Sequence, residues 1–206
     1  MTKLKCMVFI SGNGSNLKNI LSNIESGFIK DVTIEYVVSD NKNANGIKHA
    51  KEHGIKVLYI DNNYKLISGL IKEMGIGLVI LAGYMKIIPK DFMRMHDGII
   101  INIHPSLLPK YKGLDTHKKV LDNGDNQHGA SVHFATEELD SGPVIIQGVV
   151  KVNNNDDISS LRGKVHEVEY KILPLAIKWF SENIVSKHGD NYYYQGEKRT
   201  SPIILL

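Results

Sequence analysis

Asn102 and His104 are the first candidates for chemistry, because both can donate hydrogen bonds and they stand two positions apart at the end of an apolar run. Side chains two apart on a strand leave on the same face. Pro105 then ends the strand and keeps His104 extended, at the carboxyl edge where open α/β folds bind ligands. A lone histidine in a strand is more often structural, but the paired amide and the prolines at 105 and 109 favour a functional pair.

The polar stretch Glu137-Glu138-Leu139-Asp140-Ser141-Gly142-Pro143 is the second candidate. Taken alone, it is a polar turn between two apolar runs. A carboxylate from this loop that reached His104 would orient the imidazole and stabilise its protonated form. The loop is therefore a candidate for a catalytic role only in combination with Asn102 and His104.

A glycine-containing loop follows the first apolar run, with the sequence Ser11-Gly12-Asn13-Gly14-Ser15-Asn16-Leu17. The glycines allow close backbone approach, and the N–H groups that open a helix bind anions, assisted here by the Ser15 hydroxyl and the Asn16 amide. A dinucleotide-binding loop would have a third glycine in place of Leu17 and an acidic residue earlier than Asp40. The loop predicts a mononucleotide phosphate site, with a tight turn that binds nothing as the alternative.

Strand-sized apolar runs alternate with helical segments through the first half of the chain. The runs cover residues 6–10, 34–38, 57–60, 78–81 and 99–103, and helical periodicity is clearest at 17–24 and 67–74. This alternation is typical of βαβ units, in which a parallel sheet carries helices on both faces.

The pattern changes after residue 128, where strands at 128–134 and 144–150 are expected to form a hairpin and make the sheet mixed. Apolar residues at helical spacing from Ile158 to Trp179 predict one long amphipathic helix, capped by Asp156 or Asp157 and kinked at Pro174. About the last twenty residues, with three consecutive tyrosines, are expected to form a loosely attached hairpin.

Composition narrows the class of protein. A length of 206 residues with 42% hydrophobic content fits one domain with a sizeable core. The formal charge of +3 is spread along the chain, which gives little support for binding nucleic acid or a membrane surface. The single cysteine, Cys6, lies in an apolar run and suits a reducing cytosol. No secretion signal or membrane span is read from the sequence, and no metal ligand set is found.

With these residues in hand, the chain resembles the folate-dependent, single-domain glycinamide ribonucleotide formyltransferases from about residue 5 to about residue 181. The words SGNGSNL, LAGYMKIIP, INIHPSLLPKYKG, NGDNQHGASVHF and ELDSGPVI stand in the family's order and spacing. The HPSLLP core is shared with methionyl-tRNA formyltransferases and formyltetrahydrofolate deformylases. SGNGSNL disfavours the tRNA enzymes, and the deformylases carry an additional amino-terminal domain, for which residues 1–4 leave no room.

The resemblance implies an open, mostly parallel Rossmann-like sheet with helices on both faces, followed by a mixed hairpin and a long C-terminal helix. It implies one domain over 1–206, with a phosphate-binding half at 1–100, a folate-binding and catalytic half at 101–185 and a tail at 186–206. The enzyme would be cytoplasmic and serve purine synthesis, as a monomer or a homodimer.

Site residues are carried over from the same resemblance. The catalytic set would be Asn102, His104 and Asp140. The substrate phosphate and ribose would contact Gly12, Asn13, Gly14, Ser15, Asn16 and Glu169, and the folate would contact Tyr84, Met85, Lys86, Ile87, Ile88, Ala135, Thr136 and Glu137. Supporting residues would be Ser106, Pro109 after a cis bond, Gly113, His117, Ser131 and His133. Two positions depart from the family pattern, since Asp115 replaces a common histidine and His166 a common glutamine or lysine.

The implied reaction moves the formyl group of 10-formyltetrahydrofolate to the amine of glycinamide ribonucleotide by direct attack, without a metal. Asn102 and His104 would stabilise the oxyanion, and Asp140 would assist proton transfer. Three alternatives stay open: a formyltetrahydrofolate hydrolase, a small nicotinamide-dependent oxidoreductase, and a nucleotide-binding module without catalysis.

Overall fold

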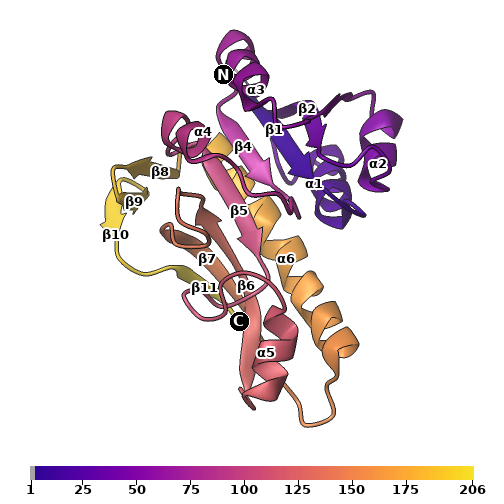
Figure 1. Ribbon diagram of the computed structural model, residues 1–206. Helices are drawn as coiled ribbons and strands as arrows, with labels where there is room; N and C mark the ends of the chain where they lie inside the picture. Colours follow the sequence, from indigo (N-terminus) through magenta and orange to yellow (C-terminus); the bar gives the residue numbers. More distant parts are fainter. Residues whose placement is uncertain (1–2) are drawn as a thin grey trace.

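An 8-stranded sheet in the order β11-β7-β6-β5-β4-β1-β2-β3 organises the protein in a computed structural model, which describes residues 3–206 (Figure 1). Its strands are β1 (Leu4–Ile10), β2 (Val32–Ser39), β3 (Lys56–Tyr59), β4 (Leu78–Leu81), β5 (Ile100–His104), β6 (Gln127–Phe134), β7 (Val144–Lys151) and β11 (Ile203–Leu205). Strands β3, β2, β1, β4 and β5 are parallel neighbours, whereas β6 is antiparallel to both β5 and β7. The predicted mostly parallel sheet with a later hairpin is confirmed.

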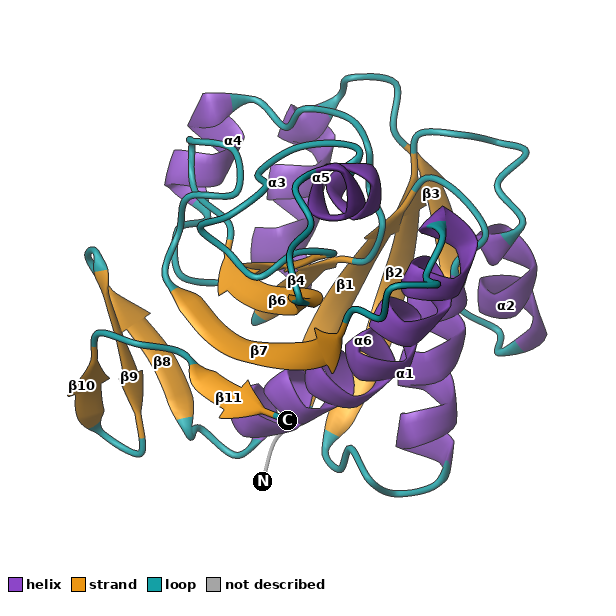
Figure 2. Ribbon diagram, turned by 90° about the horizontal axis from the view of Figure 1, so that it is seen from below, coloured by secondary structure: helices purple, strands orange, loops and turns teal. Residues whose placement is uncertain are grey.

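Helices cover both faces of this sheet. They are α1 (Ser15–Glu25), α2 (Gly46–Glu52), α3 (Tyr64–Met74), α4 (Lys90–Met95), α5 (Thr116–Asp122) and α6 (Ile158–Ser181). One core cluster joins α1, α2 and α6 to one side of the sheet, and a second joins α3 and α4 to the other side (Figure 2). Burial of strand residues on both faces explains why β1 and β4 are continuous apolar runs rather than alternating ones.

The long helix α6 begins as expected, because Asp157 accepts a hydrogen bond from the Ser160 N–H and forms a capping box with it. The helix continues without a break past Pro174 to Ser181. None of the helices in residues 3–206 is both long enough and apolar enough to cross a membrane.

The C-terminal segment corrects one expectation. Strands β8 (Val185–His188), β9 (Asn191–Tyr194) and β10 (Glu197–Arg199) form a small antiparallel sheet, so a hairpin is present. Its attachment is not loose, because Tyr192 is 2% exposed and β11 joins the main sheet parallel to β7. Burial of this aromatic ring and backbone pairing with β7 bind the tail to the domain, and neither was visible in the local sequence pattern.

The fold brings three loops to the same edge of the sheet. The strands β1, β4 and β5 are parallel, so the segments that follow Ile10, Leu81 and His104 emerge side by side. The backbone N–H of Met85 donates to Ser11 Oγ at 2.8 Å, which ties two of these segments together. The loop between β6 and β7 begins at the amino end of β5, because β6 is antiparallel to β5, and it then runs back so that Asp140 reaches His104 and the Gly113 N–H.

Candidate active site

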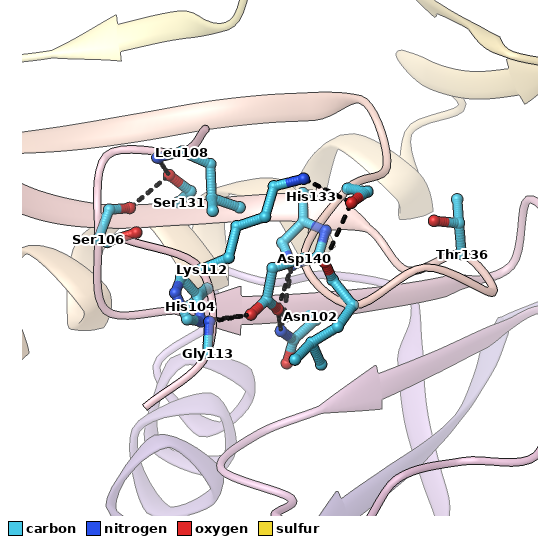
Figure 3. A network of polar contacts seen from close by, with 12 residues as sticks. Asn102, His104, Ser106, Leu108, Lys112, Gly113, Ser131, His133, Thr136 and Asp140 are labelled. Atoms are coloured by element: carbon cyan, nitrogen blue, oxygen red, sulfur yellow. Dashed lines mark hydrogen bonds and ion pairs between the residues drawn. The ribbon is translucent and has the colours of Figure 1, made fainter. Parts of the chain in front are cut away.

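Asn102 and His104 lie on β5 between β4 and β6, as their spacing predicted. In the antiparallel register Asn102 stands opposite His133 and His104 stands opposite Ser131. His104 is 6% exposed, so its ring is almost fully withdrawn from solvent. The structure thus brings both predicted side chains to one small region (Figure 3).

Asp140 is the centre of this region and contacts both side chains. One carboxylate oxygen, Oδ1, lies 3.4 Å from Asn102 Nδ2, and the other, Oδ2, lies 3.4 Å from His104 Nδ1. The Gly113 N–H also donates to Oδ2 at 2.9 Å. Asp140 itself adopts the left-handed conformation with φ 49° and is 8% exposed. The loop is therefore more than a solvated polar turn, because it delivers a buried carboxylate to the pair.

Charge at Asp140 is favoured by its neighbours. Burial raises the pKa of its carboxyl, but hydrogen bonding, including that from the Gly113 N–H, and the positive charge of the neighbouring imidazoles in their protonated form lower that pKa by more. The carboxyl pKa is consequently below its usual value, and Asp140 is ionised at neutral pH.

The protonation of His104 is set mainly by burial. Its Nε2 lies 2.9 Å from the carbonyl oxygen of Tyr111, which can only accept, so Nε2 carries a proton. Burial lowers the pKa of His104, and this outweighs the Tyr111 hydrogen bond and the Asp140 charge, which raise it. The Asp140 charge raises the pKa of His104, as expected. The resting ring is nevertheless neutral at pH 7, because desolvation opposes the imidazolium form.

The loop after His104 is held by a buried polar cluster. The Leu108-Pro109 bond is cis, as predicted. Ser131 Oγ donates to the Ser106 carbonyl at 2.6 Å and accepts from the Leu108 N–H at 3.1 Å. Gln147 Nε2 adds bonds to the Leu108 carbonyl at 2.8 Å and to Ser131 Oγ at 3.0 Å. These contacts fix the course of residues 105–109.

Sequence reasoning missed three parts of this arrangement. Gln147 was not selected, although a lone polar side chain in the apolar run 144–150 was a usable signal. The carbonyl of Tyr111 carried no signal at all, because a backbone acceptor can belong to any residue. Lys112, whose Nζ donates to Ser141 Oγ at 2.6 Å, links the loop after β5 to the loop of Asp140 and was also missed.

The predicted phosphate loop lies at the start of α1. Gly14 has φ 68°, and a Cβ on it would come within 2.5 Å of the Gly46 Cα, so the two backbones meet there without side chains. Gly12 has open space around it, and Asn13 accepts a 3.0 Å hydrogen bond from Asn45. The N–H groups at the start of α1 follow directly, in the arrangement that suits an anion.

Asn16 of this loop contacts Glu169 on α6 through its side chain. Asn16 Nδ2 donates to Glu169 Oε2 at 3.1 Å, and both side chains are buried. Burial raises the pKa of Glu169 to about 7, and the Asn16 bond lowers it by less. The Asn16 amide is thus partly committed to Glu169, whereas we had expected it to assist the anion site.

The predicted folate slot presents apolar side chains at the same edge. Met85 is 78% exposed and Ile87 is 88% exposed, while Tyr84 and Ile88 pack against the second core cluster. Tyr84 also shares a 2.9 Å hydroxyl contact with Tyr64. Met85 and Ile87 are therefore not part of the core, and their apolar side chains are available to contact a ligand.

The backbone of residues 135–137 runs beside this surface. Ala135 is buried and its N–H donates to the Ile100 carbonyl, and Thr136 Oγ1 donates to the Glu138 carbonyl. Glu137 forms a two-point ion pair with Arg94 on α4, with both N···O distances 2.9 Å. The loop that carries Asp140 is therefore tied to the neighbouring helix.

His117 forms a pair with His128, with Nδ1 and Nε2 separated by 3.0 Å. Burial is the main cause that lowers the pKa of each to about 4. His166, one turn before Glu169, stacks on Tyr170, and burial followed by the charge of Arg162 lowers its pKa. Within residues 3–206 no group of three or more His, Cys, Asp or Glu side chains is arranged to hold a metal ion.

The fold and this site define a formyl transferase, because the family model described as "Formyl transferase" matches residues 4–177 and the chain belongs to that family. It is 37% identical over 201 residues to the phosphoribosylglycinamide formyltransferase of Haemophilus influenzae, covering 94% of each chain. It is 38% identical to the enzyme of that name from Escherichia coli, covering 95% of each chain. Among solved structures, a phosphoribosylglycinamide formyltransferase from Coxiella burnetii superposes with a TM-score of 0.93 at 33% identity, covering 99% of this chain and 100% of that one.

Proposed function

We propose that this protein transfers the formyl group of 10-formyltetrahydrofolate to the amine of glycinamide ribonucleotide, giving formylglycinamide ribonucleotide and tetrahydrofolate in purine synthesis. The observation that carries the proposal is the Asp140 carboxylate, which lies 3.4 Å from both Asn102 Nδ2 and His104 Nδ1. The names of the relatives support the same reaction.

Each substrate would bind on its own side of this carboxylate. The phosphate of the ribonucleotide would bind the loop of residues 12–16 at the start of α1, and its ribose would contact Glu169. The pteridine would bind the surface of Tyr84 to Ile88 and the backbone of residues 135–137, where Lys86 and Thr136 add polar groups. This arrangement would place the amine and the formyl carbon next to Asn102 and His104.

The reaction would proceed by direct attack. The amine nitrogen forms a bond to the formyl carbon, and the former carbonyl oxygen gains negative charge. Asn102 Nδ2 and His104 Nδ1 would donate to that oxyanion, because their contacts with Asp140 are long and can be exchanged. The C–N bond to the folate then breaks, and the proton lost by the amine reaches the departing folate nitrogen through Asp140 and a water.

His104 would have to donate as an imidazolium. Its Nε2–H is held by the Tyr111 carbonyl, so only Nδ1 faces the reacting atoms, and Nδ1 carries a proton only in the charged ring. Asp140 and the developing oxyanion both favour this charge. Burial therefore keeps the resting ring neutral, while the reaction itself would favour its protonation.

An assay of folate product with and without glycinamide ribonucleotide tests the proposal. Release that depends on the ribonucleotide is expected. Equal release in its absence would identify a formyltetrahydrofolate hydrolase, which the names of the relatives do not support. Binding of a nicotinamide cofactor would favour an oxidoreductase, and a His104→Ala protein with unchanged properties would favour a module without catalysis.

Two further expectations stay proposals. The buried thiol of Cys6, whose pKa is raised by burial, suits a protein of a reducing compartment such as the cytosol. A monomer or a homodimer is the expected assembly, which sedimentation at two protein concentrations would determine.

A further inference from the structure

His133 lies close to Asn102 and His104, the proposed catalytic pair, and it is 2% exposed. It stands on β6 directly opposite Asn102 in the antiparallel register. Three groups surround the nitrogens of its ring: the Phe134 carbonyl, the Asn102 amide and the Asp140 carboxylate. A buried imidazole with defined partners on both nitrogens has a determinable tautomer.

The contacts of the ring assign its protons. Nδ1 lies 2.9 Å from the Phe134 carbonyl oxygen, which can only accept, so Nδ1 is the protonated nitrogen. Nε2 lies 3.1 Å from Asn102 Nδ2 and 3.6 Å from Asp140 Oδ1. The first distance is a hydrogen bond and the second is too long for one. Nε2 therefore accepts from the amide, and the ring is the neutral Nδ1–H form.

This tautomer determines how the Asn102 amide is used. The amide nitrogen has two hydrogens, and one of them is taken by His133 Nε2 at 3.1 Å. The other points at Asp140 Oδ1 over 3.4 Å, the weaker of the two contacts. An oxyanion would displace the weaker contact and leave the anchor at His133 in place.

We propose that His133 is a positioning residue for formyl transfer: its neutral ring anchors one N–H of Asn102, so that the amide presents the other N–H to the oxyanion. This inference rests on the proposed function. Without the anchor, the amide could turn its oxygen toward the reacting carbonyl and would repel the developing negative charge.

The charged groups around His133 make its neutral state part of the proposal. Asp140 faces Nε2 from the loop between β6 and β7, and the His104 ring faces Asp140 from β5. A proton on Nε2 would direct that nitrogen to Asp140 and remove the acceptor for Asn102. Protonation of His133 would therefore release the amide and reduce turnover.

A double-mutant cycle between His133 and Asn102 tests this role. His133→Leu removes the acceptor and approximately keeps the volume, and His133→Gln restores an acceptor. We expect His133→Leu to lower kcat about 10-fold or more with little change in either KM, and His133→Gln to recover most of the loss. In an Asn102→Ala background, His133→Leu should change kcat by less than about twofold, because the group that it positions is gone.

Additive losses in the cycle would overturn the proposal, since they would show that His133 acts independently of Asn102. His96→Leu is a matched control, because His96 is a buried histidine whose Nε2 lies 2.9 Å from Ser68 Oγ on α3, and it is not one of the proposed site residues. Its kcat should remain near that of the parent. Equal kcat losses in His96→Leu and His133→Leu would also overturn the proposal, as a general effect of removing a buried imidazole.

Nitrogen NMR of the parent keeps the test decisive if His133→Leu does not fold. The ¹⁵N shifts of His133 should show a protonated Nδ1 and an unprotonated Nε2 at neutral pH. A protonated Nε2 would overturn the assignment. The proposed function is judged separately, by whether the parent enzyme transfers the formyl group to glycinamide ribonucleotide at all.

Discussion

The Asn16 side chain donates a 3.1 Å hydrogen bond to Glu169, a residue 153 positions away in the sequence. The bond links α1, which opens at the proposed phosphate loop, to the middle of α6. Among the described residues, Asn16 Oδ1 is buried without a hydrogen-bond partner, and Glu169 is 5% exposed. A buried carboxyl group destabilises the folded state when it is charged. The stability of the protein should therefore depend on the ionisation of Glu169.

Glu169→Gln should make stability less sensitive to pH. Burial raises the pKa of Glu169 from 4.5 to about 7, so the folded state binds the proton more tightly than the unfolded state. The resulting stabilisation is present below the unfolded pKa and is lost as pH rises through about 7. From pH 5 to pH 8 the parent should lose on the order of 2–3 kcal/mol that the Gln variant does not lose.

Urea unfolding at both pH values measures this difference. Glu167→Gln is the matched control, because Glu167 lies on the same helix and is exposed. It should keep the pH dependence of the parent. Equal slopes for the parent and Glu169→Gln would show that the carboxyl is not titrating near neutrality.

Gly14→Ala should destabilise the fold, whereas Gly12→Ala should not. The new methyl group at Gly14 would stand 2.5 Å from the Gly46 Cα, in a left-handed backbone with φ 68°. The steric clash and the unfavourable backbone conformation together should lower the free energy of unfolding by about 2–4 kcal/mol. Gly12 has open space, so its variant should stay within about 0.5 kcal/mol of the parent.

Gly12→Ala is then the clean probe of the phosphate site. If the ribonucleotide phosphate approaches this backbone, the added methyl group should raise the KM for the ribonucleotide and leave the KM for the folate nearly unchanged. Steady-state kinetics with each substrate varied in turn provide the measurement. Parallel changes in both constants would argue against a phosphate at residues 12–16.

Asn102→Ala and His104→Ala should each lower turnover by about 10² or more, with small effects on the binding of either substrate. Both remove a donor that is proposed to act on the oxyanion and only weakly on the ground state. Single-turnover rates and ligand titrations separate the two effects. Near-normal turnover of His104→Ala would remove the central catalytic assignment.

Asp140→Asn should lower the pKa of His104 below that of the parent. The carboxylate raises this pKa, although burial lowers it by more, so loss of the negative charge leaves burial less opposed. A smaller imidazolium fraction at each pH should reduce kcat. NMR titration of His104 in both proteins, with turnover measured on the same samples, checks the direction. An unchanged titration with unchanged turnover would make Asp140 a structural loop residue.

The His117–His128 pair should cost stability in acid. Both rings are kept neutral, with pKa values lowered from 6.5 to about 4. The unfolded chain takes up protons below about pH 6.5, so the stability of the folded state is lost as pH falls from there toward 4. His128→Gln should flatten this part of the curve. Urea unfolding at pH 7 and pH 4.5 measures the change, with the exposed His188→Gln as a control.

The elements of the fold followed from local patterns. Continuous apolar runs such as residues 78–81 predicted buried parallel strands, and β4 has those bounds. The spacing from Ile158 to Trp179 predicted α6, because side chains on one helical face repeat every three or four residues. Asp156 or Asp157 was expected as its cap, and the structure has Asp157. The tail was less predictable, since burial of Tyr192 and pairing of β11 depend on contacts with distant parts of the chain.

The sequence predicted which residues belong to the candidate site better than it predicted how those residues are arranged. Asn102 and His104 could be chosen because a strand, its end and a following proline are all local features. Asp140 was identified through the family resemblance. Its distance from His104 depends on the path of the loop between β6 and β7, which the sequence does not predict. His133 was only a supporting residue until the β5–β6 register placed it opposite Asn102.

The sequence by itself indicated the alternation of strands and helices in the first half of the chain, the later hairpin, the long helix α6 and the residue types at the sheet edge. It also identified the formyl transferase family through motifs that are contiguous in the chain. Only the tertiary structure decided the tautomer of His133, the neutral resting state of His104 and the raised pKa of Glu169. These properties depend on burial and on hydrogen-bond partners from distant segments, and protonation equilibria respond to those surroundings rather than to neighbours in sequence.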